Sequence, residues 1–404
     1  MGYEVKTLEY CVGKKGLFSD GDWVESKDQD PDGDVRLIQM ADVGINFYKN
    51  KSDRYLTTAK FDELKCQLLY PGDILVSRMP DPIGRACIFP GDEKKCATVV
   101  DIAIIRVDDT IANNKFLCYR INAVDIRAKI EKQATGTTRK RISGKKLKAI
   151  TIPLPPLNTQ KKIVEILDTA QRLIDKRKEQ IKEMDKLVQS LFYDMFGDPV
   201  TNPKGWEVKK LIHIVSGKYG VKAGPFGSSL KKQDYVKHGY RVYGQEQVIA
   251  GRFDIGDYYI DQEKFEKLKS CEIKTGDLLV SLVGSFGKIL IVPNGIEKGI
   301  INPRLLKITL NNDLIIPRFF SELFKLPITQ ESLSSSAHGG TMGILNATIL
   351  KDLNVVLPPI SLQNTFAERV QAIEAQKEAM TKSLKQMEDN FNSLMQRAFK
   401  GELV

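Results

Sequence analysis

Apolar side chains recur every three or four residues along two long stretches of the chain, residues 158–197 and 361–404. Heptad spacing over that length predicts two long helices whose apolar seams pair in a coiled coil. One basic residue interrupts each seam, Arg177 in the first and Lys377 in the second. The apolar seam residues are Leu167, Ile174, Ile181, Met184, Val188 and Leu191 in the first helix, and Val370, Ile373, Met380, Leu384, Met387, Phe391 and Leu394 in the second.

Shorter apolar runs, separated by Gly, Pro, Asp and Asn, fill residues 1–157 and 198–360. Runs such as ILVS, ACIFPG and LLKITL predict short strands bounded by turns. Residues 115–132 and 317–336 have patterns typical of helices. We therefore expect two α+β globular domains, each followed by one long helix.

The two halves of the chain repeat each other. LKAITIPLPP ends at Pro156 and LKDLNVVLPP ends at Pro359, which gives a repeat offset of 359 − 156 = 203. Gln160 and Gln363 differ by the same number. Such a tandem duplication predicts a pseudo-two-fold molecule, in which two similar globular domains are separated by an antiparallel coiled coil. The predicted segments are domain 1 (1–157), helix 1 (158–197), domain 2 (198–360) and helix 2 (361–404).

Composition narrows the class of protein. The formal charge of +10 is compatible with a polyanionic partner. The six cysteines form no CxxC pair and the three histidines are scattered, so we predict no metal site. Cysteines without a pairing pattern are typical of reduced thiols, and we expect a cytoplasmic protein. The polar start and the lack of a long apolar run predict neither a signal peptide nor a membrane span.

Three segments carry a resemblance to a known family. They are PLPPLNTQKKIVEIL from Pro153, SLFYDMFGDPVTNPKGWEVKKL from Ser190, and SLMQRAFKGEL from Ser393. Together they resemble the specificity subunit of type I restriction–modification systems, over essentially the whole chain. In that family each half is a target-recognition domain, which reads one half of a bipartite DNA sequence, followed by a spacer helix. The resemblance implies a sequence-specific protein that binds double-stranded DNA.

The same resemblance implies partners that carry the chemistry. Two modification subunits with S-adenosylmethionine would methylate adenine, and restriction subunits would cleave DNA with ATP and Mg²⁺. This chain itself would bind no cofactor and contribute no catalytic residue. In agreement, it has neither the phosphate-binding G-x-x-x-x-G-K-[ST] nor the [DNS]-P-P-[YFW] tetrapeptide of amino-methyltransferases. A coiled-coil adaptor or an RNA-binding protein is the alternative, because charge and heptads fit those classes too.

In the first domain, DNA contact is predicted from a segment with eight basic residues, 129–148. Its centre, TGTTRKRISG, combines basic, hydroxyl and glycine residues, which is typical of loops that approach phosphates. A solvated surface loop is the other interpretation. Arg78 and Arg85 follow a predicted strand and are predicted to contact guanine. The contacts predicted from the basic segment are Thr137, Arg139, Lys140, Arg141 and Lys145.

In the second domain, residues 216–232 combine glycines with four lysines, as in a loop that lies against a DNA backbone. Arg241 and Gln245 either read bases or only satisfy turns. Lys288 lies in the segment that matches residues 77–85, and Thr341 in the segment that matches the basic run. The full set predicted for this domain is Lys218, Lys222, Ser228, Arg241, Gln245, Lys288 and Thr341.

Overall fold

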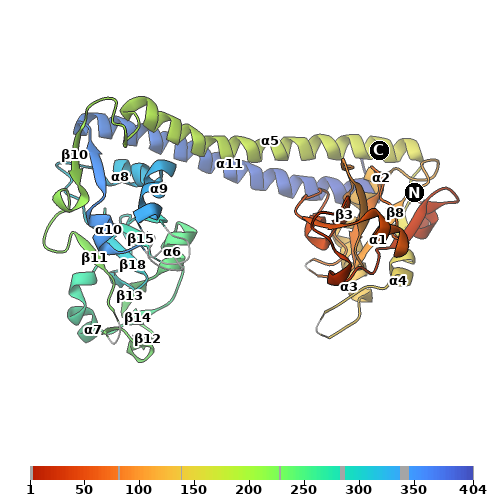
Figure 1. The fold of residues 1–404 in the computed structure, drawn as a ribbon, viewed down its shortest axis with the longest axis horizontal. Coiled ribbons are helices and arrows are strands. Elements are labelled where there is room, and N and C mark those ends of the chain that lie inside the picture. The colour runs from red at the N-terminus through yellow and green to blue at the C-terminus, as the bar shows by residue number, and fades with distance from the viewer. Residues whose placement is uncertain are drawn as a thin grey trace. The chain divides into compact units, whose positions relative to one another are not determined.

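The computed structural model describes residues 3–80, 82–137, 139–226, 229–282, 287–336 and 345–403. The chain divides into two compact units, Met1–Lys178 with Lys382–Val404, and Glu179–Thr381. Each unit contains one globular α+β domain and parts of two long helices, α5 (Leu157–Phe196) and α11 (Ile360–Lys400), which are the longest elements in Figure 1. Both helices begin one residue before their predicted starts.

The first domain is built on two small sheets. Continuous apolar runs such as ILVS are strands buried on both faces: Ile74 and Val76 pack into one core cluster, and Leu75 packs into another. One sheet is antiparallel, in the order β2 (Leu17–Asp20), β8 (Ile102–Arg106), β5 (Ile74–Ser77), β6 (Ala86–Ile88). The other has the order β4 (Arg54–Leu56), β3 (Val35–Ile38), β7 (Lys95–Thr98), and β1 (Val5–Thr7) pairs separately with β9 (Thr151–Pro153).

The second domain repeats this arrangement, with one additional strand in its second sheet. Ser19 of β2 lies opposite Ile104 of β8, and at the repeat offset Lys222 lies opposite Lys307 in the equivalent pair of strands. Its first sheet has the order β11 (Val221–Ala223), β18 (Leu305–Ile308), β15 (Leu278–Ser281), β16 (Ile289–Ile291). Its second has the order β12 (Tyr235–Val236), β14 (Tyr259–Ile260), β13 (Tyr240–Tyr243), β17 (Gly299–Ile301), and β10 (Glu207–Lys210) pairs with β19 (Asn354–Leu357).

Each predicted helix beside the sheets is two helices. Ala123 and Leu326, which occupy equivalent positions of the repeat, have extended backbone conformations and break them. Leu326 precedes Pro327, which disfavours helical geometry at that residue, and Arg120 bridges the first break through its bidentate pair with Asp125. The helices are α2 (Asn114–Asn122), α3 (Val124–Gln133), α8 (Pro317–Lys325) and α9 (Pro327–Ser336), with the short α1 (Thr58–Glu63), α4 (Gly144–Lys148), α6 (Gln245–Ala250), α7 (Gln262–Lys267) and α10 (Ala347–Lys351).

Within each unit the two long helices run antiparallel. In the first, early residues of α5 pack with late residues of α11, and Lys178 Nζ lies 2.9 Å from Glu388 Oε1. In the second, the rings of Phe192 and Phe366 are 5.6 Å apart. Lys377, which interrupts the apolar seam, ion-pairs with Asp185 of the facing helix at 2.5 Å. All thirteen apolar seam residues named above are buried or half-buried.

A buried glutamine attaches each domain to the helix that follows it. Gln160 accepts a hydrogen bond from the Asn113 amide at 2.8 Å and donates to the carbonyls of Pro155 and Ile111 at 2.8 and 3.2 Å. Gln363, its equivalent in the repeat, makes the same three bonds at 3.0, 2.8 and 3.1 Å. These two glutamine joints fix the loop before α2 or α8 against the start of α5 or α11.

Candidate nucleic-acid interface

Residues 135–137 and 139–141, between α3 and α4, belong to a loop that we call the basic loop. Thr135 and Arg141 close it through two backbone hydrogen bonds of 2.9 and 2.8 Å. Gly136 has φ +116°, and a Cβ there would lie 2.6 Å from the Arg139 carbonyl, so the turn requires glycine. The side chains of Thr137 and Arg139 are exposed at the tip. The loop therefore presents hydroxyl and guanidinium groups to solvent on a closed backbone.

The base of the basic loop is fixed by two arginine–aspartate pairs. Arg141 Nε lies 2.7 Å from Asp101 Oδ1, and Arg78 Nη1 lies 3.1 Å from Asp20 Oδ2. Backbone hydrogen bonds connect the pairs, because Arg78 donates to the Asp101 carbonyl and Ile142 donates to the Arg78 carbonyl. Burial lowers the pKa of Arg78, while Asp20 acts against that shift. Arg78 thus supports the loop from inside the domain.

Two further cations flank the tip of the loop. Lys140 is exposed and lies 3.9 Å from Glu131 Oε1, in a pair whose two side chains are more than half exposed. Lys145, in the first turn of α4, is also exposed. Water screens such pairs strongly, so these charges remain available to an approaching anion. Thr137, Arg139, Lys140 and Arg141 lie on the basic loop, and Lys145 follows it in α4.

Two other predicted contacts point into the protein. Arg85 is buried and donates to three backbone carbonyls, at 2.7, 2.9 and 3.1 Å. Arg241 is buried, pairs with Glu297 and donates to the carbonyls of Ile255 and Gly256. In this structure both guanidinium groups hold loops of their own domains. A direct base contact by either one stays a prediction.

The second domain gathers fewer of its predicted contacts. Lys218 and Lys222 lie over the ring of Tyr219, with their ammonium nitrogens 5.6 and 5.4 Å from its centre. Lys288 is exposed just before β16, and Gln245 is the first residue of α6. Ser228 and Thr341 lie outside the described residues.

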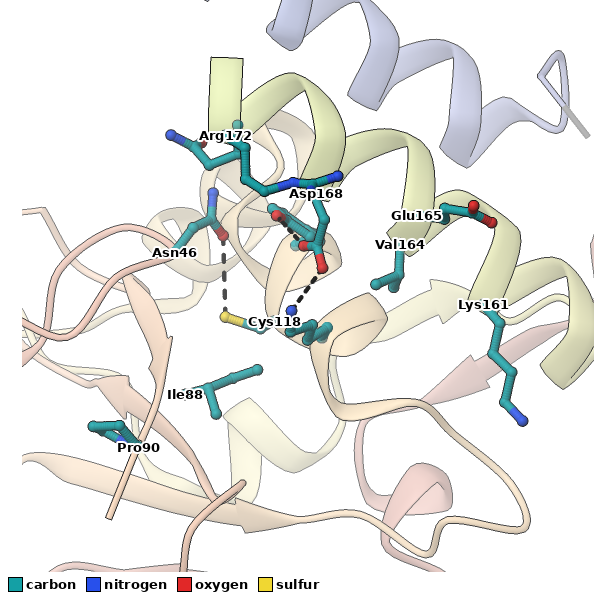
Figure 2. Close-up of a pocket in the computed structure, with 12 residues that line it drawn as sticks. Asn46, Ile88, Pro90, Cys118, Lys161, Val164, Glu165, Asp168 and Arg172 are labelled. Atoms are coloured by element: carbon teal, nitrogen blue, oxygen red, sulfur yellow. Dashed lines mark hydrogen bonds and ion pairs between the residues drawn. The ribbon is translucent and has the colours of Figure 1, made fainter. Parts of the chain in front are cut away.

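A cavity of about 780 Å³ opens between the first domain and α5, and Figure 2 shows its lining. Asp168 on α5 lies at its centre, with Oδ2 2.6 Å from Lys115 Nζ. Tyr119 donates its hydroxyl proton to Asp168 Oδ1 at 2.8 Å. Burial and this bond raise the pKa of Tyr119. Asp168 is thus bonded to two residues of α2, and these bonds hold α2 against α5.

Two exposed aromatic side chains were not predicted as contacts. Trp23 and Phe226 are 68% and 69% exposed, and 226 − 23 = 203, so they occupy the same position in the two domains. A search for basic residues overlooks them, whereas the repeat offset would have found them.

The raised pKa of Asp22, the residue before Trp23, leads us to expect a pH dependence of the free energy of unfolding. Burial raises its pKa to about 6, although the Gln67 amide donates a hydrogen bond to it. Because the folded protein holds this proton more tightly than the unfolded chain, stability should fall as pH rises from about 4 to 6. Asp22→Asn should remove that part of the decline in urea-unfolding midpoints. An unchanged profile would contradict the assignment, and exposed Asp62→Asn is the control.

Among the described residues, no three His, Cys, Asp or Glu side chains gather as potential metal ligands. Within those ranges, no helix combines the length and the apolar character needed to cross a membrane.

Comparison with known proteins decides the family. The type I restriction modification DNA specificity domain matches twice, at residues 17–183 and 203–389. The chain belongs to this family. Each match of the specificity domain covers one globular domain and much of the helix after it, as the internal repeat requires.

Specificity subunits of other type I systems are similar to this specificity-domain protein in sequence. The Escherichia coli type I restriction enzyme EcoBI specificity subunit is 25% identical over 68% of this chain and 63% of its own length. The Methanocaldococcus jannaschii MjaVIII specificity subunit is 24% identical over 68% and 67%. A chain from a solved structure on complex assembly of the type I R-M system covers 100% of this chain and 98% of its own, with a TM-score of 0.65. At 15% identity that likeness concerns the fold.

Replacing Arg139, Lys140 and Arg141 of the specificity-domain protein with alanine should flatten the salt dependence of duplex binding. Each phosphate contact contributes about 0.9 to the slope of log K against log salt. Because Asp101 already pairs with Arg141, we expect the slope to fall by about two. Anisotropy of a labelled duplex, titrated between about 50 and 200 mM salt, measures it.

The matched control removes three exposed lysines of α5, Lys161, Lys162 and Lys176. It changes the net charge equally but leaves the basic loop intact. Equal losses of slope in the two variants, or none in the loop variant, would mean that the loop contacts no phosphate.

Proposed function

We propose that this chain is the sequence-reading subunit of a type I restriction–modification system. The observation that carries the proposal is the basic loop, an exposed cationic tip on a rigidly anchored base in one of two duplicated domains. A fixed cationic loop suits phosphate contacts, which set the position of a protein on DNA. The membership of the chain in the specificity-domain family supports the same conclusion.

Each domain is proposed to read its own half of a bipartite site in double-stranded DNA. The two domains have separate hydrophobic cores, so their reading surfaces can differ while their folds remain alike. Lys218 and Lys222 around Tyr219 supply cations in the second domain, in place of the basic run of the first. Two domains with the same fold but different DNA-facing side chains would read different half-sites.

The chemistry is proposed to come from partners. Two modification subunits would supply S-adenosylmethionine and methylate adenine, and restriction subunits would supply ATP- and Mg²⁺-dependent cleavage. In this scheme the chain has no catalytic residue and binds no cofactor, and it acts in the cytoplasm with its DNA. The paired charges in the cavity beside α5 are consistent with this assignment, because Asp168 is already bonded to Lys115 and Tyr119.

A binding competition tests the DNA proposal. The full chain is titrated against a pool of labelled random duplexes, with unlabelled duplex DNA or structured RNA as competitor. We expect salt-dependent binding that duplex DNA displaces at far lower concentration than RNA. Preference for RNA would favour an RNA-binding protein, and binding of neither would favour a coiled-coil adaptor.

Methylome sequencing tests the reading of a bipartite site. A host that carries the chain together with its matching modification subunit should gain methylated adenines in one split motif. Deleting the gene for this chain alone should remove that methylation. A continuous motif, or methylation that survives the deletion, would contradict the proposal.

A further inference from the structure

An exposed aromatic residue follows the same strand end in both domains. The amide of Gly21, just after β2, donates to the Ile102 carbonyl at 2.8 Å. The amide of Gly224, just after β11, donates to the Leu305 carbonyl at 3.0 Å. The two donors occupy equivalent positions of the repeat, and so do the two acceptors. Trp23 and Phe226 each stand two residues after the glycine, so the backbone places them equivalently.

Close backbone packing explains why both turns contain glycine. A Cβ on Gly21 would lie 2.1 Å from the Val99 carbonyl oxygen, and one on Gly224 would lie 1.9 Å from that of Asn302. Backbone cannot move aside as a side chain can, so no larger residue fits. The turn is therefore tightly held, and the aromatic side chain beyond it is presented on a rigid support.

The two aromatic side chains lie open to solvent. Among the large hydrophobic side chains in the described ranges, Trp23 and Phe226 have the two highest exposed fractions, 68% and 69%. Apart from the glycine, the segments GDW and GPF differ in the residue before the aromatic and in the type of aromatic. A large apolar side chain exposed at one place in both repeats suggests a binding role rather than a packing role.

The charges around Trp23 connect it to the basic loop. Val100 donates its amide to the Asp22 carbonyl at 2.8 Å, and the next residue, Asp101, holds Arg141. On the other side, the Trp23 indole donates to Glu25 Oε1 at 3.3 Å. Lys27 neutralises that carboxylate, with its ammonium nitrogen 2.8 Å from Glu25 Oε2. Trp23 therefore lies close to the Asp101–Arg141 pair at the base of the basic loop, in a segment that also carries the carboxylates of Asp20 and Asp22.

The corresponding segments of the second domain carry two cations. The position equivalent to Asp101 is held by Arg304, which is exposed and follows the Asn302–Pro303 turn. Lys222 lies on β11, four residues before Phe226. The second domain thus has positive charge where the first has the Asp101–Arg141 pair.

We propose that Trp23 and Phe226 stack on DNA bases, one in each half-site. This inference rests on the proposed function, since it needs a duplex on the basic surface of each domain. Hydrogen bonds to base edges differ with the sequence that is read, whereas every base has a π-face. An aromatic contact is therefore one that two domains with different specificities can share. Rigid apolar side chains also insert as wedges between base pairs.

Fluorescence tests the contact directly. The chain has two tryptophans, and Trp206 is half-buried with its indole donating to the Phe196 carbonyl at 2.9 Å. In a Trp206→Phe background, Trp23 is the only indole. We expect saturating duplex DNA to quench its emission and protect it from acrylamide. Phe226→Trp, placed in a background with both native tryptophans replaced by phenylalanine, should respond in the same way.

Affinity supplies the second readout. Trp23→Ala or Phe226→Ala should weaken duplex binding roughly 5- to 150-fold, as expected for the loss of one stacked base contact. The slope of log K against log salt should not change, because no charge is removed. Trp23→Phe should retain most of the affinity. The control is Phe47→Ala, an aromatic residue 58% exposed on a loop beside the cavity that faces α5.

Each outcome of these measurements is informative. Quenching by DNA together with salt-independent loss of affinity supports the stacking contact. Duplex binding with unquenched Trp23 overturns it, while the proposed function stands. Protection of Trp23 by added modification subunits but not by DNA overturns it in favour of a protein-docking surface. Failure of the unaltered chain to bind any duplex would overturn the proposed function and the stacking contact together.

Discussion

A chain whose residues 1–155 are replaced by the domain of another family member is expected to direct methylation to a site with one new half. The other half-site should be unchanged, because the second domain has its own cores and no residue of them is exchanged. Methylome sequencing of a host that carries the chimaera reads both halves at once. A change in both half-sites would contradict the model of two independent readers.

The structure shows which contacts the chimaera must keep. The ring of Phe399, near the end of α11, lies 5.6 Å from that of Phe116, and Phe391 lies 6.1 Å from Tyr119. Aromatic residues should therefore be retained at positions 116 and 119 of the incoming domain. As a control, a second chimaera that loses both aromatics should fold poorly, which separates failure to fold from altered reading.

Gln160→Ala is expected to lower the free energy of unfolding by about 3 kcal/mol, and Gln363→Ala by a similar amount. Each glutamine is at most 1% exposed and satisfies one amide and two carbonyls. Alanine would leave those three groups without their partner, at a cost of about 1 kcal/mol or more for each. Urea unfolding, followed by circular dichroism, measures the loss.

Two further variants sharpen the glutamine experiment. Gln160→Glu keeps an acceptor for the Asn113 amide but loses both donations to carbonyls, so it should also be destabilised. Gln396→Ala, at an exposed position of α11, is the matched control and should stay within about 0.5 kcal/mol. A loss of less than about 1 kcal/mol at both joints would show that water replaces the glutamine.

Much of the fold could be predicted because its signals are local or repeated. The run ILVS is a strand because both of its faces are buried, and the heptads are helices because their seams pair. The two helix breaks were not predicted, because apolar periodicity continues through them. Pro327 is a local signal for the break at Leu326, whereas the break at Ala123 has no such signal and is bridged by the pair between Arg120 and Asp125.

The candidate contacts were harder to predict. The basic loop could be found because its charge, glycine and hydroxyl residues are adjacent in the sequence. The inward orientation of the Arg85 side chain could not be predicted. Two of its hydrogen-bond acceptors, the carbonyls of Met40 and Val43, are distant along the chain. For Arg241 the sequence left base reading and the satisfaction of turns open, because its partner Glu297 is also remote in the sequence. Trp23 and Phe226 have no charge signal, so only comparison of the repeats identifies them.

The two glutamine joints have a genetic consequence. Because both use equivalent backbone partners, the coding segments for LPP and the glutamine that follows it should be interchangeable parts. Recombination between two gene copies within either segment would exchange one domain for another. The glutamine and its three hydrogen bonds would be retained. New combinations of half-sites would then arise by shuffling whole domains, without stepwise mutation of the surfaces that read DNA. Duplication of the joint provides no redundancy, however, since each copy secures a different domain.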